Sequence, residues 1–275
     1  MWHTVRMNDE PPKSVPPTVH ARRGIYLLPN LFTTGALFAG FYAIVAAIDG
    51  NFHRAGMAVF VAMLMDGMDG RIARLTSTES DFGKEYDSLS DMVSFGLAPA
   101  LVIYQWGVER LSEYGVAWGR LGWLAAFLYA VTAALRLARF NTRVAKVDKR
   151  FFEGLPSPSA AALVAGLVWV GTDLGIDGLT GLTAAFFVTA AAGVLMVSRI
   201  PYYSFKELNL GSRVPFAYVL LIPLVFVLIS LDPPAVLFLL FLIYALSGPA
   251  WMLWRFRRRR RRGQTAGESE PTDDR

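Results

Sequence analysis

Residues 66–91 read DGMDGRIARLTSTESDFGKEYDSLSD, and apolar sequence flanks them on both sides. Residues 55–65 before them read AGMAVFVAMLM, and residues 92–107 after them read MVSFGLAPALVIYQWG. The flanks decide the fold class, because backbone groups in hydrocarbon must be hydrogen-bonded within their own segment, which predicts helices. Carboxylates are costly beside lipid, so acidic residues placed between two such segments indicate a functional site.

The composition extends this interpretation to the whole chain. Of its 275 residues 54% are hydrophobic, and the mean hydropathy is +0.39, which is unusual for a soluble domain. Membrane helices need about 20 apolar residues each. We therefore expect an all-α, polytopic membrane bundle of about eight transmembrane helices, drawn at residues 25–48, 55–77, 87–107, 119–140, 156–173, 179–197, 214–231 and 235–254.

The distribution of positive charge predicts the orientation of these helices. If the N-terminus is cytoplasmic, all of the 27 Lys and Arg residues except Arg54, Arg110 and Arg120 fall on the cytoplasmic side. Cytoplasmic loops of membrane proteins carry this excess. We therefore expect a multi-pass protein of the cell (plasma) membrane, with both termini and the active site at the cytoplasmic face.

The two ends of the chain differ from its apolar middle. Residues 1–23 are polar and Pro-rich and predict a flexible cytoplasmic tail, 24–255 form the transmembrane domain, and 256–275 form a basic and then disordered cytoplasmic tail. The run RFRRRRRR at 255–262 directly follows a predicted span, which favours contact with anionic membrane lipids over nucleic acid. The chain has no Cys, which excludes disulfides and thiolate chemistry.

The spacing of the acidic residues places them on matching helix faces. At 100° per residue, Asp66 and Asp69 lie about 60° apart on one helix. The same face carries Gly70, Ala73 and Arg74, so two small residues leave room for a ligand beside the two carboxylates.

The next helix adds a second acidic face. Asp87 and Asp91 are four residues apart and stack on one side. The short polar connection LTSTESDFGK at 75–84 makes the two helices antiparallel neighbours, so the acidic faces can meet. Four carboxylates brought together repel one another unless a hard cation neutralises them. Oxygen-only ligation suits Mg²⁺ or Mn²⁺, as one ion or a pair.

Two other interpretations remain open at this point. Interfacial Asp residues can be solvated caps or partners of Arg71, Arg74 and Lys84, which suits one or two carboxylates better than four. A divalent-cation transporter also uses intramembrane carboxylates, but it needs them near the midplane with a continuous polar path. Here the carboxylates gather at one end, and the second half of the chain lacks a matching set.

The pattern also resembles a known family. Eight residues match the signature of the CDP-alcohol phosphotransferases at every position: Asp66, Asp69, Gly70, Ala73, Arg74, Gly83, Asp87 and Asp91. Looser similarities resemble the membrane-integral phosphatidylserine synthase branch of that family, in the stretches YLLPNLFTTGALFAGFYAI (26–44), RLARFN (136–141), FFEGLPSPSAAA (151–162) and SRIPYYSFK (198–206).

The resemblance implies roles for the matching residues. It implies that Asp66, Asp69 and Asp87 are metal ligands. It implies that Asp91 lies near the metals and acts as the general base, and we include Asp91 among the expected metal ligands as well. It implies contacts to the cytidine nucleotide or CDP-diacylglycerol from Pro29, Asn30, Thr33, Gly70, Arg74, Ser80 and Gly83. Serine carries a carboxylate that a guanidinium can hold, so the candidates for the acceptor site are the basic residues at and just after the cytoplasmic end of the fourth span: Arg136, Arg139 and Arg143.

The resemblance also implies a reaction. The phosphatidyl group of CDP-diacylglycerol would pass to the L-serine hydroxyl, giving phosphatidylserine and CMP, with two Mg²⁺ or Mn²⁺ ions and a homodimeric enzyme. A sister enzyme with glycerol 3-phosphate or inositol phosphate as acceptor, a phosphatidylglycerophosphate or phosphatidylinositol-phosphate synthase, is the nearest alternative. Such acceptors carry a phosphate and need a denser Arg pocket near the metals.

Overall fold

The computed structural model describes residues 27–143, 151–176, 178–203 and 216–267, with side chains described for 28–142, 153–176, 178–203 and 223–255. The predicted tail at 1–23 lies outside the described residues. The elements follow in chain order as α1 (Leu27–Ile48), α2 (Phe52–Thr76), α3 (Asp81–Asp91), a π-helical segment η1 (Met92–Leu97), α4 (Ala98–Trp106), a 3₁₀ segment η2 (Val108–Tyr114), α5 (Val116–Arg143), β1 (Phe151–Glu153), α6 (Ser157–Asp173), α7 (Leu179–Val197), β2 (Pro201–Tyr203), α8 (Phe216–Leu231) and α9 (Pro233–Gly267).

The predicted helical fold class is confirmed, and within the described residues each of the apolar segments drawn from the sequence overlaps one or more helices. In the described part of the chain, four helices are long and apolar enough to cross a membrane by length and composition: Leu28–Ile48, Val116–Thr142, Leu179–Val197 and Pro233–Arg255. The acidic and basic residues of α2 and α3 lower the hydropathy of the second and third segments. The count of eight spans therefore stays a prediction.

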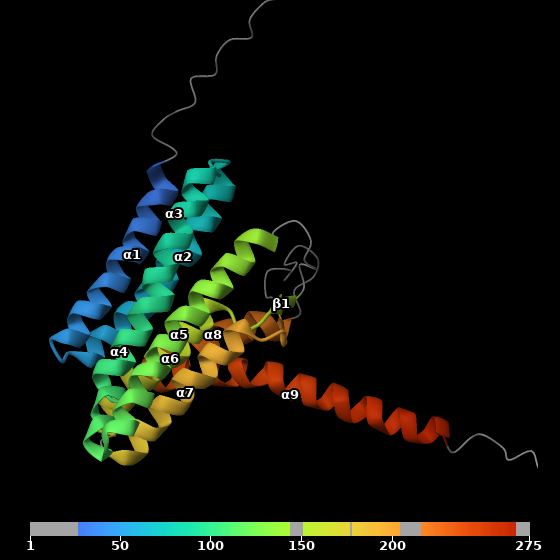
Figure 1. Ribbon diagram of the computed structural model, residues 1–275. Helices are drawn as coiled ribbons and strands as arrows, with labels where there is room; N and C mark the ends of the chain where they lie inside the picture. Colours follow the sequence, from blue (N-terminus) through green and yellow to red (C-terminus); the bar gives the residue numbers. More distant parts are fainter. Residues whose placement is uncertain (1–26, 144–150, 177, 204–215, 268–275) are drawn as a thin grey trace, which may run out of the picture.

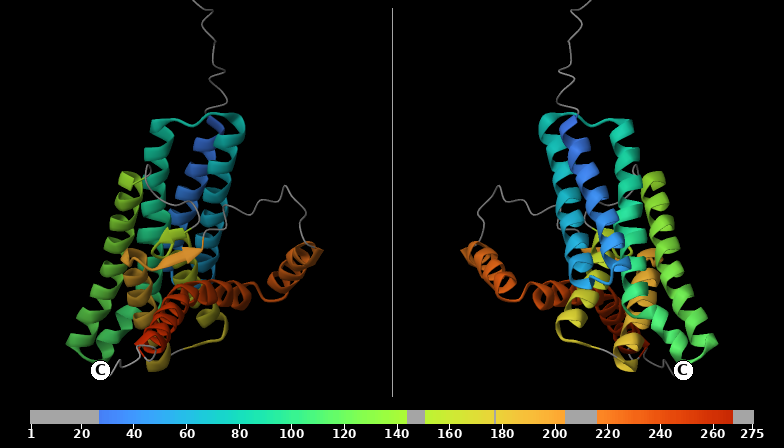
Figure 2. Two further views of the ribbon diagram at one scale, coloured as in Figure 1. Left: turned by 90° about the vertical axis from the view of Figure 1, so that its right-hand side faces the viewer. Right: turned by 90° about the vertical axis from the view of Figure 1, so that its left-hand side faces the viewer.

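The first three helices form an antiparallel group that carries the acidic motif (Figures 1 and 2). Gly50, with φ of 74°, reverses the chain after α1, and Asn51 caps α2 by accepting a hydrogen bond from Arg54 N at 3.3 Å. At Gly40 on α1 an added Cβ would lie 2.6 Å from Ser94 Oγ of η1. The small residue therefore allows α1 and η1 to approach closely.

The second half of the chain packs around α6. This helix is rich in buried Ala and contacts α2, α7 and α9, while α5 packs along α7. α9 runs away from the bundle in Figure 1, and it continues to Gly267 through the run of Arg residues. Arg is a good helix former, so the positive charge of this run does not by itself end the helix.

A small sheet joins two loops of the second half, and the sequence did not predict it. β1 and β2 pair antiparallel with Phe151 opposite Tyr203 and Glu153 opposite Pro201. The buried Tyr202 donates a hydrogen bond to the Ala245 carbonyl of α9 at 2.9 Å. The sheet therefore ties the segments before α6 and after α7 to α9.

Candidate active site

The turn between α2 and α3 brings the two acidic faces together. Ser77 ends α2 in the left-handed conformation with φ of 52°, and Thr78 N donates to the Ala73 carbonyl at 3.0 Å. Ser80 then caps α3 by accepting a hydrogen bond from Gly83 N at 3.0 Å. The connection is shorter than the polar stretch in the sequence suggested, because Gly83 already belongs to the first turn of α3.

Three of the predicted carboxylates converge between α2 and α3. Asp66, Asp69 and Asp87 each offer a carboxylate oxygen, and these oxygens lie within 4.8 Å of one another. Asp69 is 6% exposed and is held by Thr33 of α1, whose Oγ1 donates to Asp69 Oδ2 at 2.7 Å. The buried Oδ1 of Asp87 has no hydrogen-bond partner among the described residues. The group thus combines close negative charges with an unsatisfied buried oxygen.

These features fit a divalent cation. The donor set consists of oxygen, as Mg²⁺ and Mn²⁺ require, and opposite ligands of an octahedral Mg²⁺ lie about 4.2 Å apart. The observed spread of up to 4.8 Å is close to that value. A cation at this position would offset the mutual repulsion of the carboxylates and occupy the free oxygen of Asp87.

Asp91 lies one turn beyond Asp87, outside this group of three. Its side chain is in hydrogen-bonding contact with Asp66 and is attracted electrostatically by Arg136 of α5. The π-helical η1 begins at the next residue, and such segments often occur at functional sites. The structure therefore places Asp91 beside the cluster, and its roles as ligand and as general base stay predictions.

The hydroxyls of α3 and η1 fix these helices against α1. Ser90 Oγ donates to the Thr33 carbonyl at 3.1 Å, and Ser94 Oγ donates to the Ala36 carbonyl at 3.0 Å, both in buried positions. Asp87 and Asp91 are close to Ser90 in the sequence. These two hydrogen bonds therefore fix the position of both Asp residues along the axis of α1.

A cavity of about 500 Å³ opens next to the carboxylates. It is lined by Pro29, Asn30, Thr33, Asp69, Gly70, Ala73, Thr78, Glu79, Ser80, Asp81, Gly83, Lys84 and Asp87. All of the predicted nucleotide contacts are in this lining except Arg74. The exposed Arg74 donates from Nε to the Gly70 carbonyl at 2.8 Å, so its guanidinium lies beside the cavity wall.

Two glycines border the cavity in different ways. A Cβ added to Gly70 would meet nothing within 4 Å, so the backbone of α2 faces open space there. A Cβ added to Gly83 would lie 3.1 Å from Ser80 Oγ and 3.5 Å from Asn30 Oδ1. Gly70 therefore leaves room for a ligand, whereas Gly83 lets α3 approach the start of α1.

The three basic candidates for the acceptor site lie in different environments. Arg136 donates from Nη1 to Ser157 Oγ of α6 at 2.6 Å, and its Nε is buried without a hydrogen-bond partner among the described residues. Arg139 donates from Nη1 to the Val197 carbonyl at the end of α7, at 3.1 Å. The side chain of Arg143 lies outside the described residues.

Some residues of this region were missed by the sequence analysis. Thr78, Glu79, Asp81 and Lys84 line the cavity, and their position between the matched residues could have indicated them. Ser157 and Asn141 were also missed. Asn141 Nδ2 of α5 donates to Ser88 Oγ of α3 at 2.9 Å. Both contacts join residues far apart in the chain, so no local pattern predicts them.

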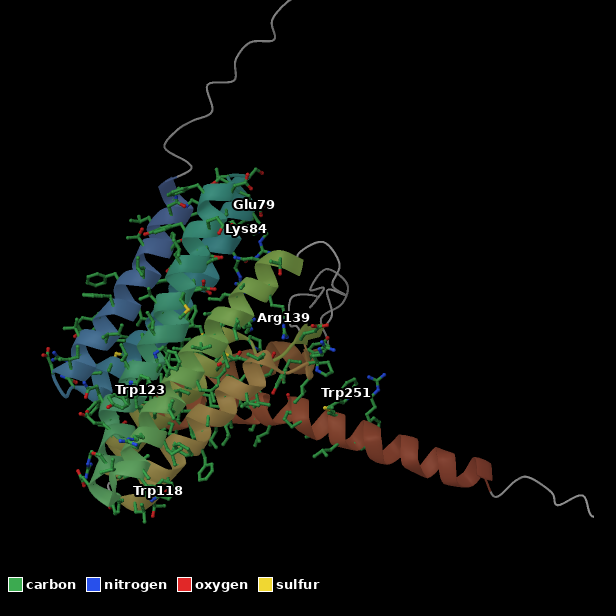
Figure 3. All side chains as sticks on the ribbon, viewed as in Figure 1. Glu79, Lys84, Trp118, Trp123, Arg139 and Trp251 are labelled. Atoms are coloured by element: carbon green, nitrogen blue, oxygen red, sulfur yellow. The ribbon has the colours of Figure 1, made fainter. Side chains whose placement is uncertain are left out.

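The ends of the bundle differ in character. Figure 3 shows Glu79 and Lys84 at the end that carries the cavity, whereas Trp118 lies at the opposite end. Exposed Trp residues are typical of membrane interfaces. Trp118 and Trp123 are 49% and 53% exposed, and Trp123 stacks on Phe127 with the ring planes 2° apart.

Known proteins that are similar in sequence to this chain carry names that agree with the family indicated by the motif. The family model described as CDP-alcohol phosphatidyltransferase matches residues 26–199, which include α1 to α7. A protein from Helicobacter pylori named CDP-diacylglycerol–serine O-phosphatidyltransferase is 38% identical over 224 residues, covering 81% of this chain and 90% of the relative. A protein of the same name from Mycobacterium tuberculosis (strain ATCC 25618 / H37Rv) is 39% identical over 189 residues, covering 66% and 63%. The archaetidylserine synthase of Methanothermobacter thermautotrophicus is 34% identical over 177 residues, covering 64% and 69%.

Proposed function

The chain belongs to the CDP-alcohol phosphatidyltransferase family, and we propose that it transfers the phosphatidyl group of CDP-diacylglycerol to the hydroxyl of L-serine, releasing CMP. The observation that carries this proposal is the 38% identity to the Helicobacter pylori phosphatidyltransferase, which extends over 90% of that relative. The family and the long apolar helices make the chain an integral membrane protein. The cavity beside the acidic cluster supplies a place for the reaction.

The CDP head of the donor would occupy the cavity. A volume of about 500 Å³ lies within the usual range for small-molecule sites, roughly 300–1,000 Å³. Gly70 leaves the wall of α2 open, and Asn30 of α1 and Ser80 at the start of α3 offer hydrogen-bonding groups to the cavity. The acyl chains of the donor would stay in the bilayer, beside the apolar faces of the bundle.

The acidic cluster would hold the metal ions, for which we propose two Mg²⁺ or Mn²⁺. Asp66, Asp69 and Asp87 supply carboxylate oxygens within 4.8 Å of one another, with Asp91 next to them. When bound, such ions polarise the diphosphate of the donor and offset the charge on the leaving phosphate. Thr33 keeps Asp69 oriented through its hydrogen bond of 2.7 Å.

Asp91 would act on the acceptor. A serine hydroxyl is a weak nucleophile until a base accepts its proton. The hydroxyl oxygen forms a bond to the phosphorus that carries diacylglycerol, the bond from that phosphorus to CMP breaks, and the proton passes to the Asp91 carboxylate. General base catalysis of this kind contributes about 10²–10⁴-fold to a rate.

An acceptor screen tests the proposal. Purified protein in detergent is supplied with CDP-diacylglycerol, Mn²⁺ and one labelled alcohol at a time: L-serine, glycerol 3-phosphate or inositol phosphate. We expect CMP release that depends on L-serine, with label appearing in the lipid. CMP release with glycerol 3-phosphate or inositol phosphate but not with L-serine would contradict the assignment and favour a sister enzyme.

We further propose eight spans with both termini in the cytoplasm of a plasma-membrane homodimer, and contact between the basic end of α9 and anionic lipid. The lack of native Cys makes the orientation testable. In intact cells, Glu113→Cys in η2 should react with a membrane-impermeant maleimide, whereas Glu79→Cys beside the cavity should react only after permeabilisation. The reverse pattern would contradict the orientation. Crosslinking in membranes tests the dimer.

A further inference from the structure

The strongest unexplained feature outside the acidic cluster is a buried, incompletely paired guanidinium. Arg136 lies near the C-terminal end of a candidate membrane span, Val116–Thr142, where an unpaired cation is costly. Its Nη1 donates to Ser157 Oγ at 2.6 Å, but its buried Nε has no partner among the described residues. A guanidinium carries five donors in a planar fork that matches a carboxylate. The described residues around Arg136 therefore leave its Nε without an acceptor.

Two hydrogen bonds between α5 and the α3–η1 segment show where Arg136 lies relative to Asp91. Asn141 reaches Ser88 at 2.9 Å, and the buried Tyr129 donates to the Phe95 carbonyl at 3.0 Å. The two helices are antiparallel, because the later residue of α5 pairs with the earlier residue of α3. Along the α3–η1 segment, Asp91 lies between the contact residues Ser88 and Phe95. Along α5, Arg136 lies between Tyr129 and Asn141. Asp91 and Arg136 are therefore at a similar height in the bundle.

Arg136 and Asp91 attract each other electrostatically, yet they form no direct ion pair in the part of the chain that the structure describes. The N-terminus of α6 lies on the Ser157 side, and its free backbone N–H groups also favour an anion. Tyr244 of α9 is close enough to act electrostatically on Arg136. Arg136 is therefore influenced by residues of α3, α6 and α9, while its Nε remains available for an anion.

We propose that Arg136, held in place by Ser157, binds the carboxylate of the acceptor and so selects an amino acid over simple amino alcohols. This inference rests on the proposed function. With its carboxylate on the guanidinium, L-serine would present its hydroxyl toward Asp91. Arg136 would then be an acceptor-binding residue and Ser157 a positioning residue. Arg139 has a different role, because it is bonded to the Val197 carbonyl and ties α5 to the end of α7.

The test compares two acceptors that differ only at the carboxylate. kcat and KM are measured for L-serine and for L-serinamide with the full-length wild type, Arg136→Lys, Ser157→Ala and the matched control Arg139→Lys. Lys keeps the positive charge and loses the planar fork. Equilibrium binding of labelled CMP in the presence of Mn²⁺ measures separately whether the nucleotide site of the donor is intact.

We expect Arg136→Lys to raise KM for L-serine roughly tenfold or more, the scale of a lost charge-assisted hydrogen bond, with CMP binding unchanged. The preference for L-serine over L-serinamide should fall by the same factor. Ser157→Ala should raise KM less and leave kcat near that of the wild type, and Arg139→Lys should keep the preference.

An unchanged preference in Arg136→Lys, or an equal loss with both acceptors, overturns the inference while the proposed function stands. If Arg136→Lys does not fold, the preference of Ser157→Ala for L-serine over L-serinamide is the test: an unchanged preference overturns the inference. Absence of serine-dependent CMP release in the wild type overturns the proposed function, and the inference with it.

Discussion

The hydrogen bond from Thr33 to Asp69 provides a sharp test of the metal site. Thr33 is 4% exposed and Asp69 is 6% exposed, so the hydrogen bond between them is largely shielded from solvent. Thr33→Val keeps the shape of the side chain and removes the donor that lies 2.7 Å from Asp69 Oδ2. Asp69 would then lose the contact that sets the orientation of its carboxylate toward Asp66 and Asp87.

The size of the effect follows from the type of bond. A hydrogen bond to a charged group contributes about 1.5–3 kcal/mol, and each 1.4 kcal/mol is about tenfold in a binding constant. Loss of a residue that orients a metal ligand typically weakens metal binding about 10–100-fold. We therefore expect the dissociation constant for Mn²⁺ to rise by about 10–100-fold in Thr33→Val.

The measurement is direct binding of Mn²⁺ to purified protein, followed by the electron paramagnetic resonance signal of the free ion without donor or acceptor. Thr34→Val is the matched control. Thr34 is the next residue of α1, and its exposed hydroxyl contacts the Asn30 carbonyl at 2.7 Å and the Tyr86 hydroxyl at 2.9 Å. Dissociation constants within twofold of each other for the two variants would refute the assignment of Thr33 as the group that orients a metal ligand.

Three further predictions test the other parts of the site. Asp91→Asn should lower serine-dependent CMP release by about 10²–10⁴-fold while labelled CMP still binds; turnover near the wild-type rate would exclude Asp91 as the base. Gly70→Ala should leave the melting temperature unchanged, since its Cβ meets nothing within 4 Å, but weaken CMP binding. Gly67→Ala, also without a neighbour within 4 Å, is its control, and equal CMP affinities would remove Gly70 from the nucleotide site. Chelation with EDTA should abolish turnover and added Mn²⁺ should restore it; activity that survives exhaustive chelation contradicts the metal site.

The local sequence pattern was sufficient to predict the helices and the acidic face of each helix. Long apolar runs in hydrocarbon have few alternatives to helix, so the apolar segments correspond to observed helices. The i, i+3 and i, i+4 spacing of the Asp residues places them on one side of each helix, and a short turn joins the two sides. The grouping of Asp66, Asp69 and Asp87 therefore agrees with the sequence analysis.

Contacts between distant segments could not be read in this way. The π-helical turn after Asp91 and the β1–β2 pairing depend on how neighbouring helices pack. The bonds from Arg136 to Ser157 and from Asn141 to Ser88 join residues 21 and 53 positions apart. Of three similar basic candidates at the end of α5, the hydrogen bond to Ser157 of α6 distinguishes Arg136, since Ser157 engages only part of its guanidinium.

The amino-acid sequence alone thus determined a helical membrane protein with acidic residues paired across one short turn, because hydrophobic runs and helical periodicity are local properties. The tertiary structure decided which hydroxyl orients Asp69, which oxygen of Asp87 is left without a donor, and which arginine lies near Asp91. These depend on the distances between helices that are remote in the chain, and such distances are set by close packing at positions such as Gly40 against Ser94.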